Sequence, residues 1–461
     1  MIPYDRVINY QLEALHFGDK RLNLRCKTSF SQMEKRGFNK SFPEIFQDVK
    51  SLKRFYELMN NEKVTLDRFN DGYLNGLIDY FSIESNREGH DYLFNYQDTT
   101  FGKYNNRKIE LGYTETEKSN GLIIHSGILT GSDYIPLGIA HQLQIKRDRA
   151  FFGKKAERAT KDFEQKESYK WVDGLRWAHR FNEFVKIPIV QVNDRESDIA
   201  DFFNMTFSLK QFFLVRSMHN RKIEESEQKL YDFIENQPVK FETERTLIDA
   251  DGKKHTVICS VKYALVQFEN VDAPIWAIYL KANNPPQNME ETSWTLLTNL
   301  GLNDQDEMVI KCIDAYTKRW RTTEDFHKCL KSGCSIEQRQ FRNAEAMQNM
   351  ISLMSIAAVR LLRTRHMSEL NPHAPVSIVL DEMETKVAMA LAQKFIKPID
   401  LDYCQPQTSL WWTLLLGRMG GHLGYSQKGL PGWITLSKGW QYFQNVIDGI
   451  NLSKNIFGFS P

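Results

Sequence analysis

Segment 313–331 combines the hydrophobic spacing of a helix with an acid on its apolar face. Five of its residues follow one another at intervals of four, four, three and four positions: Tyr316, Trp320, Glu324, His327 and Lys331. These intervals place side chains on one face of an α-helix. An unpaired buried carboxylate is costly, and a salt bridge, protonation or a bound cation removes the cost. The pattern therefore predicts a helix in which Glu324 has a specific partner.

Two strand-like runs each lead to an aspartate. The aromatic-rich run 92–97 precedes Asp98, and the β-branched run 187–192 is followed by Asn193 and Asp194. Strand ends are where α/β folds concentrate chemistry. Two aspartates and Glu324 would suit paired Mg²⁺ or Mn²⁺ ions, because hard cations take oxygen ligands and keep positions for phosphate and water. The three acids predict phosphodiester chemistry, with a helix cap or a salt bridge as the alternative use of each aspartate.

Hydrophobic periodicity divides the chain into three parts. Residues 1–70 read as short helices, and residues 71–368 alternate strands and helices as a mixed α/β sheet does. A β-rich insertion is expected at about 236–305, and residues 369–461 read as helices. Within these parts we expect strands at 121–129 and 256–268, a hairpin turn at 250–253, and helices at 171–184, 345–365 and 440–450.

Amino-acid composition excludes few classes of function. The net charge of +2 is too small to indicate a nucleic-acid binder, so any DNA-binding surface requires local clustering of the 60 basic side chains. The six cysteines show no zinc spacing, and we expect reduced thiols in a cytosol. The amino terminus has no apolar signal region, and no run approaches a membrane span. We therefore expect a cytoplasmic protein without a membrane partner.

Three segments resemble the motifs of DDE transposases. YQDTT contains Asp98, VNDRESDI contains Asp194, and YTKRWRTTEDFHK contains Glu324. The chain is most similar to the insertion-sequence-four family of bacterial cut-and-paste transposases, which includes the transposase of transposon five. Family-like segments at 167–171, 213–217, 294–298 and 420–440 follow in the same order. The resemblance covers most of the chain and implies a ribonuclease-H-like catalytic core with a β-rich insertion, an α-helical N-terminal DNA-binding domain and an α-helical C-terminal dimerisation domain.

The family signature Y-x2-R-x3-E-x6-K is present with one change. Tyr316-x2-Arg319 and Glu324-x6-Lys331 both match, but four residues separate Arg319 from Glu324 where the family has three. On a regular helix an extra residue rotates everything beyond it by about 100°. We predict a π-bulge between Arg319 and Glu324 that absorbs the extra residue.

The resemblance also implies contacts with DNA. Arg216, Tyr316, Arg319 and Lys331 would hold phosphates, and Trp294 would stack on a base flipped out of the transposon end. In the helical amino terminus, Arg21 and Arg25 are candidate phosphate or base contacts. The alternatives are a solvated basic helix face for the two arginines, core packing for Trp294, and pairing with carboxylates for the phosphate-holding group.

The implied activity is DNA transposition. Asp98, Asp194 and Glu324 would hold two Mg²⁺ ions, for which Mn²⁺ would substitute, and the implied steps are end nicking, hairpin formation, hairpin opening and strand transfer. The expected partners are transposon-end and target double-stranded DNA and a second copy of the chain in a homodimer, in the bacterial cytoplasm at the nucleoid. A metal-dependent nuclease on the same fold and an end-binding protein that has lost catalysis remain alternatives.

Overall fold

A computed structural model describes residues 6–106, 109–154, 160–224, 226–248, 253–286, 292–302, 305–425 and 429–457. The chain forms two compact units, each assembled from separate stretches of sequence. Unit 1 contains Met1–His90, Thr99–Lys154 and Thr322–Pro461, and unit 2 contains Asp91–Asp98 and Lys155–Arg321. Strand β1 (Leu93–Lys103) and helix α10 (Asp306–Lys328) begin in unit 2 and continue into unit 1.

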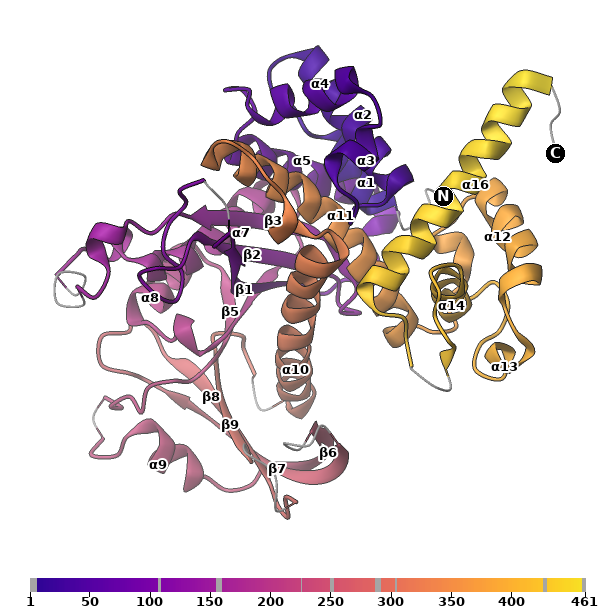
Figure 1. Ribbon diagram of the computed structural model, residues 1–461. Helices are drawn as coiled ribbons and strands as arrows, with labels where there is room; N and C mark the ends of the chain where they lie inside the picture. The colour runs from indigo at the N-terminus through magenta and orange to yellow at the C-terminus, as the bar shows by residue number, and fades with distance from the viewer. Residues whose placement is uncertain are drawn as a thin grey trace. The chain divides into compact units, whose positions relative to one another are not determined.

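Unit 2 is built on a mixed sheet with the strand order β1-β4-β5-β9-β8-β7-β6. The strands are β4 (Ile189–Asn193), β5 (Phe212–Arg216), β6 (Phe241–Ile248), β7 (Lys254–Val266), β8 (Ile275–Ala282) and β9 (Ser293–Thr298). Strands β1, β4 and β5 run parallel, and the others continue the sheet in antiparallel pairs. The predicted β-rich region thus consists of β6 to β9 (Figure 1), and most of its predicted turn at 250–253 lies outside the described residues.

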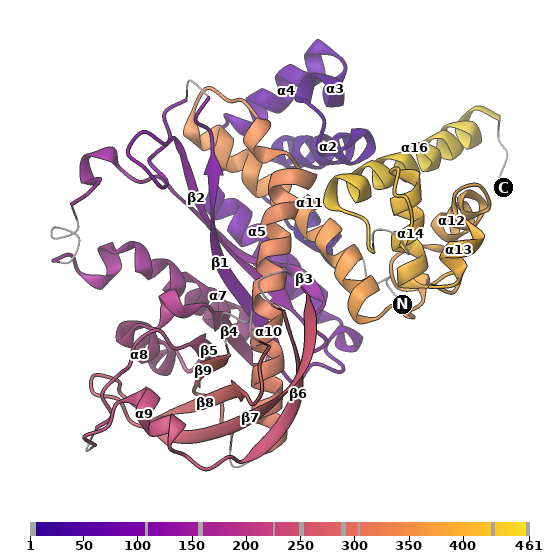
Figure 2. The ribbon, with the colours of Figure 1, turned by 60° about the horizontal axis from the view of Figure 1, so that its bottom comes forward.

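The helices of unit 2 are α7 (Lys170–Phe184), α8 (Ala200–Ser208) and α9 (Leu230–Glu235), together with the first part of α10. An aromatic core fixes α8 on the sheet, where the rings of Phe203 and Phe213 stack with centroids 4.8 Å apart. Helix α10 lies along β6 and β7 (Figure 2), and Tyr263 on β7 donates a hydrogen bond to Asp306 at 3.1 Å. This contact joins the start of α10 to the sheet of unit 2.

Unit 1 begins with a cluster of helices: α1 (Arg6–Glu13), α2 (Lys20–Arg36), α3 (Phe42–Phe46), α4 (Val49–Met59) and α5 (Leu66–Ser82). Polar residues begin three of them, since Asp19, Asp48 and Thr65 each accept a hydrogen bond from a backbone N–H in the first turn. Beside the end of β1, strands β2 (Gly121–Thr130) and β3 (Pro136–Ile145) form an antiparallel pair.

The remainder of unit 1 is helical. Helix α11 (Ala344–Leu370) is buried along most of its length, and it is followed by α12 (Glu382–Phe395), α13 (Pro398–Leu401), α14 (Ser409–Met419) and α16 (Trp433–Phe457). Helices α14 and α16 approach so closely that a Cβ on Gly439 would lie 1.8 Å from the carbonyl oxygen of Leu416. Glycine at this crossing is therefore required by packing.

Two local predictions are wrong. Asp98 does not follow a strand, because β1 continues to Lys103 and pairs with β2 beyond the aspartate. The π-bulge between Arg319 and Glu324 is absent, because α10 is a regular α-helix throughout Asp306–Lys328. A π-helical turn occurs instead at Cys329–Gly333, where the N–H of Cys334 donates to the carbonyl of Cys329 at 2.9 Å and the side chains of Cys329 and Leu330 are buried.

Candidate active site

Strand register brings Asp98 and Asp194 together in unit 2. Strands β1 and β4 run parallel with Tyr96 opposite Val192, so Asp98 and Asp194 occupy the next pair of positions on the same face. Asp98 lies within β1. Asp194 directly follows β4, and its carboxylate accepts a hydrogen bond from the N–H of Glu196 at 2.8 Å, beginning a short helical turn. Asp194 therefore combines the predicted strand-end position with a capping contact.

A buried arginine accompanies the two acids. The Nη1 atom of Arg319 lies 3.4 Å from Oδ2 of Asp98, and these two side chains are 9% and 16% exposed. Burial raises the pKa of Asp194 to about 6, an effect that Arg319 opposes and that the Asp98 charge reinforces. Two carboxylates and one cation thus share a small, poorly solvated volume.

Aromatic rings extend this cluster. The guanidinium of Arg319 lies 5.5 Å from the ring centroid of Tyr316, and that ring meets Trp294 edge to face at 6.0 Å. On the other side, the guanidinium of Arg216 lies 5.9 Å from the Trp294 ring. Strands β5 and β9 and helix α10 therefore present cations and π-faces alternately, beginning beside the aspartates. Tyr316 and Arg319 are buried, and Arg216 and Trp294 are the partly exposed members of this row. A cation beside an accessible π-face suits phosphates and unstacked bases.

Glu324 and Lys331 belong to unit 1. Glu324 forms an ion pair with Lys328 at 3.6 Å, one helical turn onward, and its side chain is 36% exposed. Lys331 lies in the π-helical turn, where burial lowers its pKa and the charge of Glu337 opposes that effect. The helix that carries Glu324 is confirmed, and its partner in the structure is a lysine on the same helix face.

The two aspartates offer oxygen donors, which are the ligands that divalent cations take. The guanidinium of Arg319 lies beside them and competes with a cation for the same carboxylates. Over the described ranges, no three or more His, Cys, Asp and Glu side chains are grouped so that they could hold a metal ion. The structure therefore assembles a pair of acids in unit 2, with Glu324 on the continuation of α10.

The predicted contacts of the amino-terminal helices lie in unit 1. Arg21 on α2 is exposed, whereas Arg25 forms an ion pair with Glu57 on α4 at 3.6 Å. A cavity of about 1010 Å³ borders α4 and is lined in part by Lys53 and Arg342. Cationic side chains beside a groove suit a phosphate backbone.

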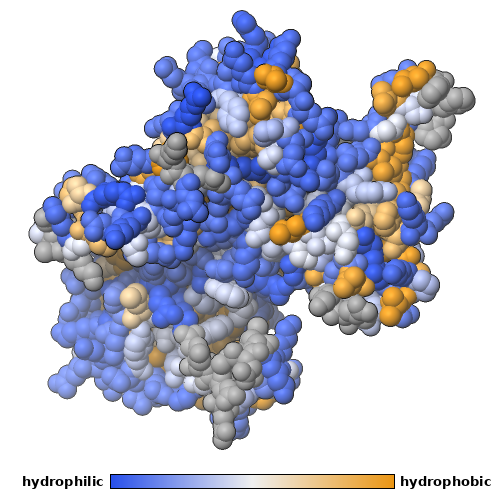
Figure 3. All heavy atoms as spheres, viewed as in Figure 1, coloured by the Kyte–Doolittle hydropathy of each residue, from blue (hydrophilic) through white to orange (hydrophobic). Residues whose placement is uncertain are grey.

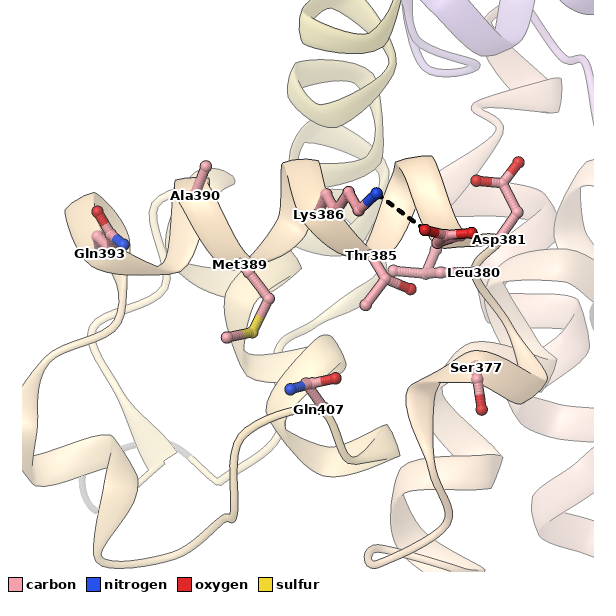
Figure 4. Close-up of a pocket in the computed structure, with 10 residues that line it drawn as sticks. Ser377, Leu380, Asp381, Thr385, Lys386, Met389, Ala390, Gln393 and Gln407 are labelled. Carbon is pink, nitrogen blue, oxygen red and sulfur yellow. Dashed lines mark hydrogen bonds and ion pairs between the residues drawn. The ribbon is translucent and has the colours of Figure 1, made fainter. Parts of the chain in front are cut away.

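A second cavity, of about 820 Å³, lies beside α12 (Figure 4). Its carboxylates have structural roles: Asp381 accepts from the N–H of Glu384 at 2.8 Å, and Glu382 pairs with Lys386 at 2.8 Å. The charges of this cavity are thus used to begin and stabilise α12.

Sequence reasoning missed two polar groups near the aspartates. Asp198 is buried and accepts hydrogen bonds from Arg221 at 2.6 Å and from the N–H groups of Met218 and His219, which fixes the loop after β5. Amide side chains on β1 and β4 are also buried. The signal for them is an alternation of Asn or Gln with apolar residues in the runs FNYQ and VQVN.

Comparison with known families identifies the amino-terminal segment. Residues 6–64 match the family model described as transposase DNA-binding. The match contains α1 to α4 and includes Arg21 and Arg25. It supports a transposase with DNA as its partner. Among the described helices, none has the length and apolar character needed to cross a bilayer.

Proposed function

We propose that this protein is a DDE-type DNA transposase of the insertion-sequence-four family, similar to the transposase of transposon five. The observation that carries the proposal is the register-paired Asp98 and Asp194 in a chain whose residues 6–64 match transposase DNA-binding domains. Neither feature alone distinguishes a transposase from other proteins. Together they combine an acid pair suited to phosphodiester chemistry with a DNA-binding segment from the same class of enzyme.

The strand order supports a ribonuclease-H-like core. Unit 1 has the order β3-β2-β1 and unit 2 continues from β1 to β4 and β5, with β3 antiparallel to β2 and with β1, β4 and β5 parallel. This is the order expected of that core. Strands β6 to β9 then correspond to the family's β-rich insertion between the second aspartate and the glutamate.

Asp98, Asp194 and Glu324 would hold Mg²⁺, with Mn²⁺ as a substitute. Two bound ions would lower the pKa of an attacking water or 3′-hydroxyl and stabilise the leaving oxygen. The proposed sequence on DNA is end nicking, attack of the 3′-hydroxyl on the opposite strand to form a hairpin, hairpin opening by water, and strand transfer. Arg319 would hold a phosphate near the cut, and its contact with Asp98 at 3.4 Å means that its positive charge lies beside the acid pair.

The remaining residues would hold DNA. The alternating side chains of Arg216, Trp294 and Tyr316 offer stacking faces and cations to a flipped base and its phosphates. Lys331 would hold a phosphate near the cut, and Arg21 and Arg25 would contact the transposon end. Helix α16 exposes apolar residues along its outer part (Figure 3), which supports a homodimer through the carboxyl-terminal helices.

A cleavage assay tests the function. Purified protein, DNA with the element's ends and Mg²⁺ should yield nicked and hairpin products, and Asp98→Ala should abolish them while leaving end binding unchanged. Asp91→Ala is the matched control, since Asp91 lies at the start of the same unit, is 81% exposed and forms a long ion pair with Lys311 at 3.9 Å. Equal cleavage by Asp98→Ala and the wild type would refute the active site.

Two observations favour an end-binding protein without catalysis as the second candidate: the regular helix through the extra residue, and the pairing of Glu324 with Lys328. A third candidate is a nuclease, which differs from a transposase only because it does not join the cut ends to target DNA. Pre-cleaved ends separate all three, because a transposase joins them to target DNA, a nuclease cuts without joining, and an inactive protein binds without either reaction.

A further inference from the structure

Four amide side chains form a buried cluster between β1 and β4. They are Asn95, Gln97, Gln191 and Asn193, and all four are fully buried. We name them the amide cluster. Their positions correspond across the parallel strands, since Asn95 is opposite Gln191 and the register continues to Gln97 and Asn193. Amides at matching positions in two adjacent strands are unexpected in a sheet interior, where apolar side chains pack best.

Hydrogen bonds join the amide cluster across the two strands. The Nδ2 atom of Asn95 donates to Oε1 of Gln191 at 2.7 Å, and Nε2 of Gln97 donates to the same oxygen at 3.0 Å. Gln97 also donates to Oδ1 of Asn193 at 3.1 Å. Each bond therefore links β1 to β4.

The amide cluster is retained at an energetic cost. Oδ1 of Asn95, Nε2 of Gln191 and Nδ2 of Asn193 are buried without a hydrogen-bond partner in the described structure. Leaving such a group unsatisfied costs about 1–3 kcal/mol. Helix α7 also packs closely against the amide cluster, because a Cβ on Gly174 would lie 2.4 Å from Nε2 of Gln97. Apolar residues would stabilise this interior more, so stability alone does not account for the amides.

What the amide cluster does define is the register of β1 on β4. Gln97 directly precedes Asp98, and Asn193 directly precedes Asp194. Because successive strand residues point to opposite faces, a slip of one residue would turn one aspartate away from the other. Directional bonds between amides penalise such a slip, whereas aliphatic side chains tolerate it.

We propose that the amide cluster is a positioning network that holds Asp98 and Asp194 at the separation a divalent cation requires. The inference rests on the proposed function, in which these acids bind metal. The amides touch neither substrate nor metal, and they act through the two strands. Groups that hydrogen-bond directly to metal ligands change metal affinity by about 10- to 100-fold when replaced, and the lower end of that range applies to groups that act through the backbone.

The test compares two buried glutamines. Gln191→Met removes the shared acceptor of the amide cluster and keeps the length of the side chain. Gln142→Met is the matched control, because Gln142 on β3 is equally buried and donates to Ser126 at 3.1 Å and to Ser355 at 2.9 Å, within unit 1. Gln97→Met is a second cluster variant, which serves if Gln191→Met does not fold. Mn²⁺ affinity by electron paramagnetic resonance and hydrogen exchange of peptides 93–98 and 189–194 are measured on each full-length protein.

We expect both cluster variants to weaken Mn²⁺ binding by about tenfold and to speed exchange in both peptides. Gln142→Met should shift the unfolding midpoint by a similar amount and change neither readout. Wild-type Mn²⁺ affinity and exchange in the cluster variants would overturn the proposal, whatever their unfolding midpoints. The double variant Asp98→Asn/Asp194→Asn tests the proposed function separately. If it retains wild-type Mn²⁺ affinity, the metal site is wrong, whereas lost binding there with normal binding in the cluster variants overturns only the positioning role.

Discussion

Replacing Asp194 by asparagine should stabilise the metal-free protein at high pH. Burial raises the pKa of this carboxyl to about 6 from its usual 3.8, so ionising it is unfavourable in the folded state. Between these two values the folded protein binds more protons than the unfolded chain does. Its stability therefore falls as pH rises through this window, and the penalty is complete above pH 6. Asparagine keeps the shape of the side chain and removes the titration.

The magnitude follows from the size of the shift. Raising the pKa from 3.8 to about 6 corresponds to a loss of folding free energy of about 3 kcal/mol at high pH, which is an upper bound. Asp194 is half-buried, and solvent screening reduces the effect, so we expect a gain of about 1–2 kcal/mol at pH 8. Arg319 keeps its contact with Asp98 at 3.4 Å in the variant, so its charge is still balanced. Near pH 4 most of the gain should disappear, because the wild-type carboxyl is then protonated in the folded state.

Urea unfolding in EDTA, followed by tryptophan fluorescence at pH 8 and pH 4, measures the difference. Asp198→Asn is the contrasting control, because Asp198 accepts hydrogen bonds from Arg221 and two backbone N–H groups and should lose stability at both pH values. An Asp194→Asn variant that is less stable than the wild type at pH 8, or equally stabilised at both pH values, would contradict the reasoning.

Other substitutions probe the remaining contacts. Arg319→Met should bind Mn²⁺ more tightly and end DNA more weakly, because the guanidinium competes with a cation for the same carboxylates; weaker binding of both in titrations would disprove the competition. Trp294→Ala should reduce hairpin formation but not end binding, measured with gel-resolved products and a fluorescent base analogue at the end; unchanged hairpin yield would remove its stacking role. Gly174→Ala should destabilise unit 2 by about 1–3 kcal/mol in urea unfolding, because its Cβ would collide with the amide cluster, and a neutral result would mean that α7 shifts freely. Arg21→Ala should reduce the slope of log K for end binding against log[salt] by about one, and Arg25→Ala should reduce it by less because Arg25 is already ion-paired; a larger reduction for Arg25→Ala would contradict this assignment.

Local elements were predictable because their signals are local. The acid before a basic run begins α2 with Asp19 as its cap, and the apolar run at 121–129 forms the buried strand β2. The extent of β1 was not predictable in this way. The aromatic-rich run 92–97 indicated a strand that ends before Asp98, but pairing with β2 extends it to Lys103. Long-range pairing overrides local preference in strands more readily than in helices.

The sequence predicted which acidic residues belong to the candidate active site, but it did not predict how they lie relative to one another. Asp98 and Asp194 stood out as acids beside strand-like runs, and their adjacency follows from a register that no local pattern encodes. The amide cluster was missed for a related reason. Asn and Gln in a strand read as polar positions facing solvent, and only the pairing of β1 with β4 shows that Gln97 and Gln191 face each other inside the protein.

The geometry of α10 and of the turn after it changes how the family roles of Arg319 and Lys331 apply to this chain. Sequence spacing indicated a disturbed helix before Glu324 and an intact one after it, and the structure has the opposite arrangement. Arg319 keeps a position beside Asp98 although the spacing that follows it is irregular. Lys331 matches the family spacing but lies in a π-helical turn, which rotates it relative to an α-helical continuation. The assigned phosphate contact of Lys331 therefore depends on the geometry of this turn, whereas Arg319 pairs with Asp98, which is the carboxylate alternative to its assigned phosphate contact.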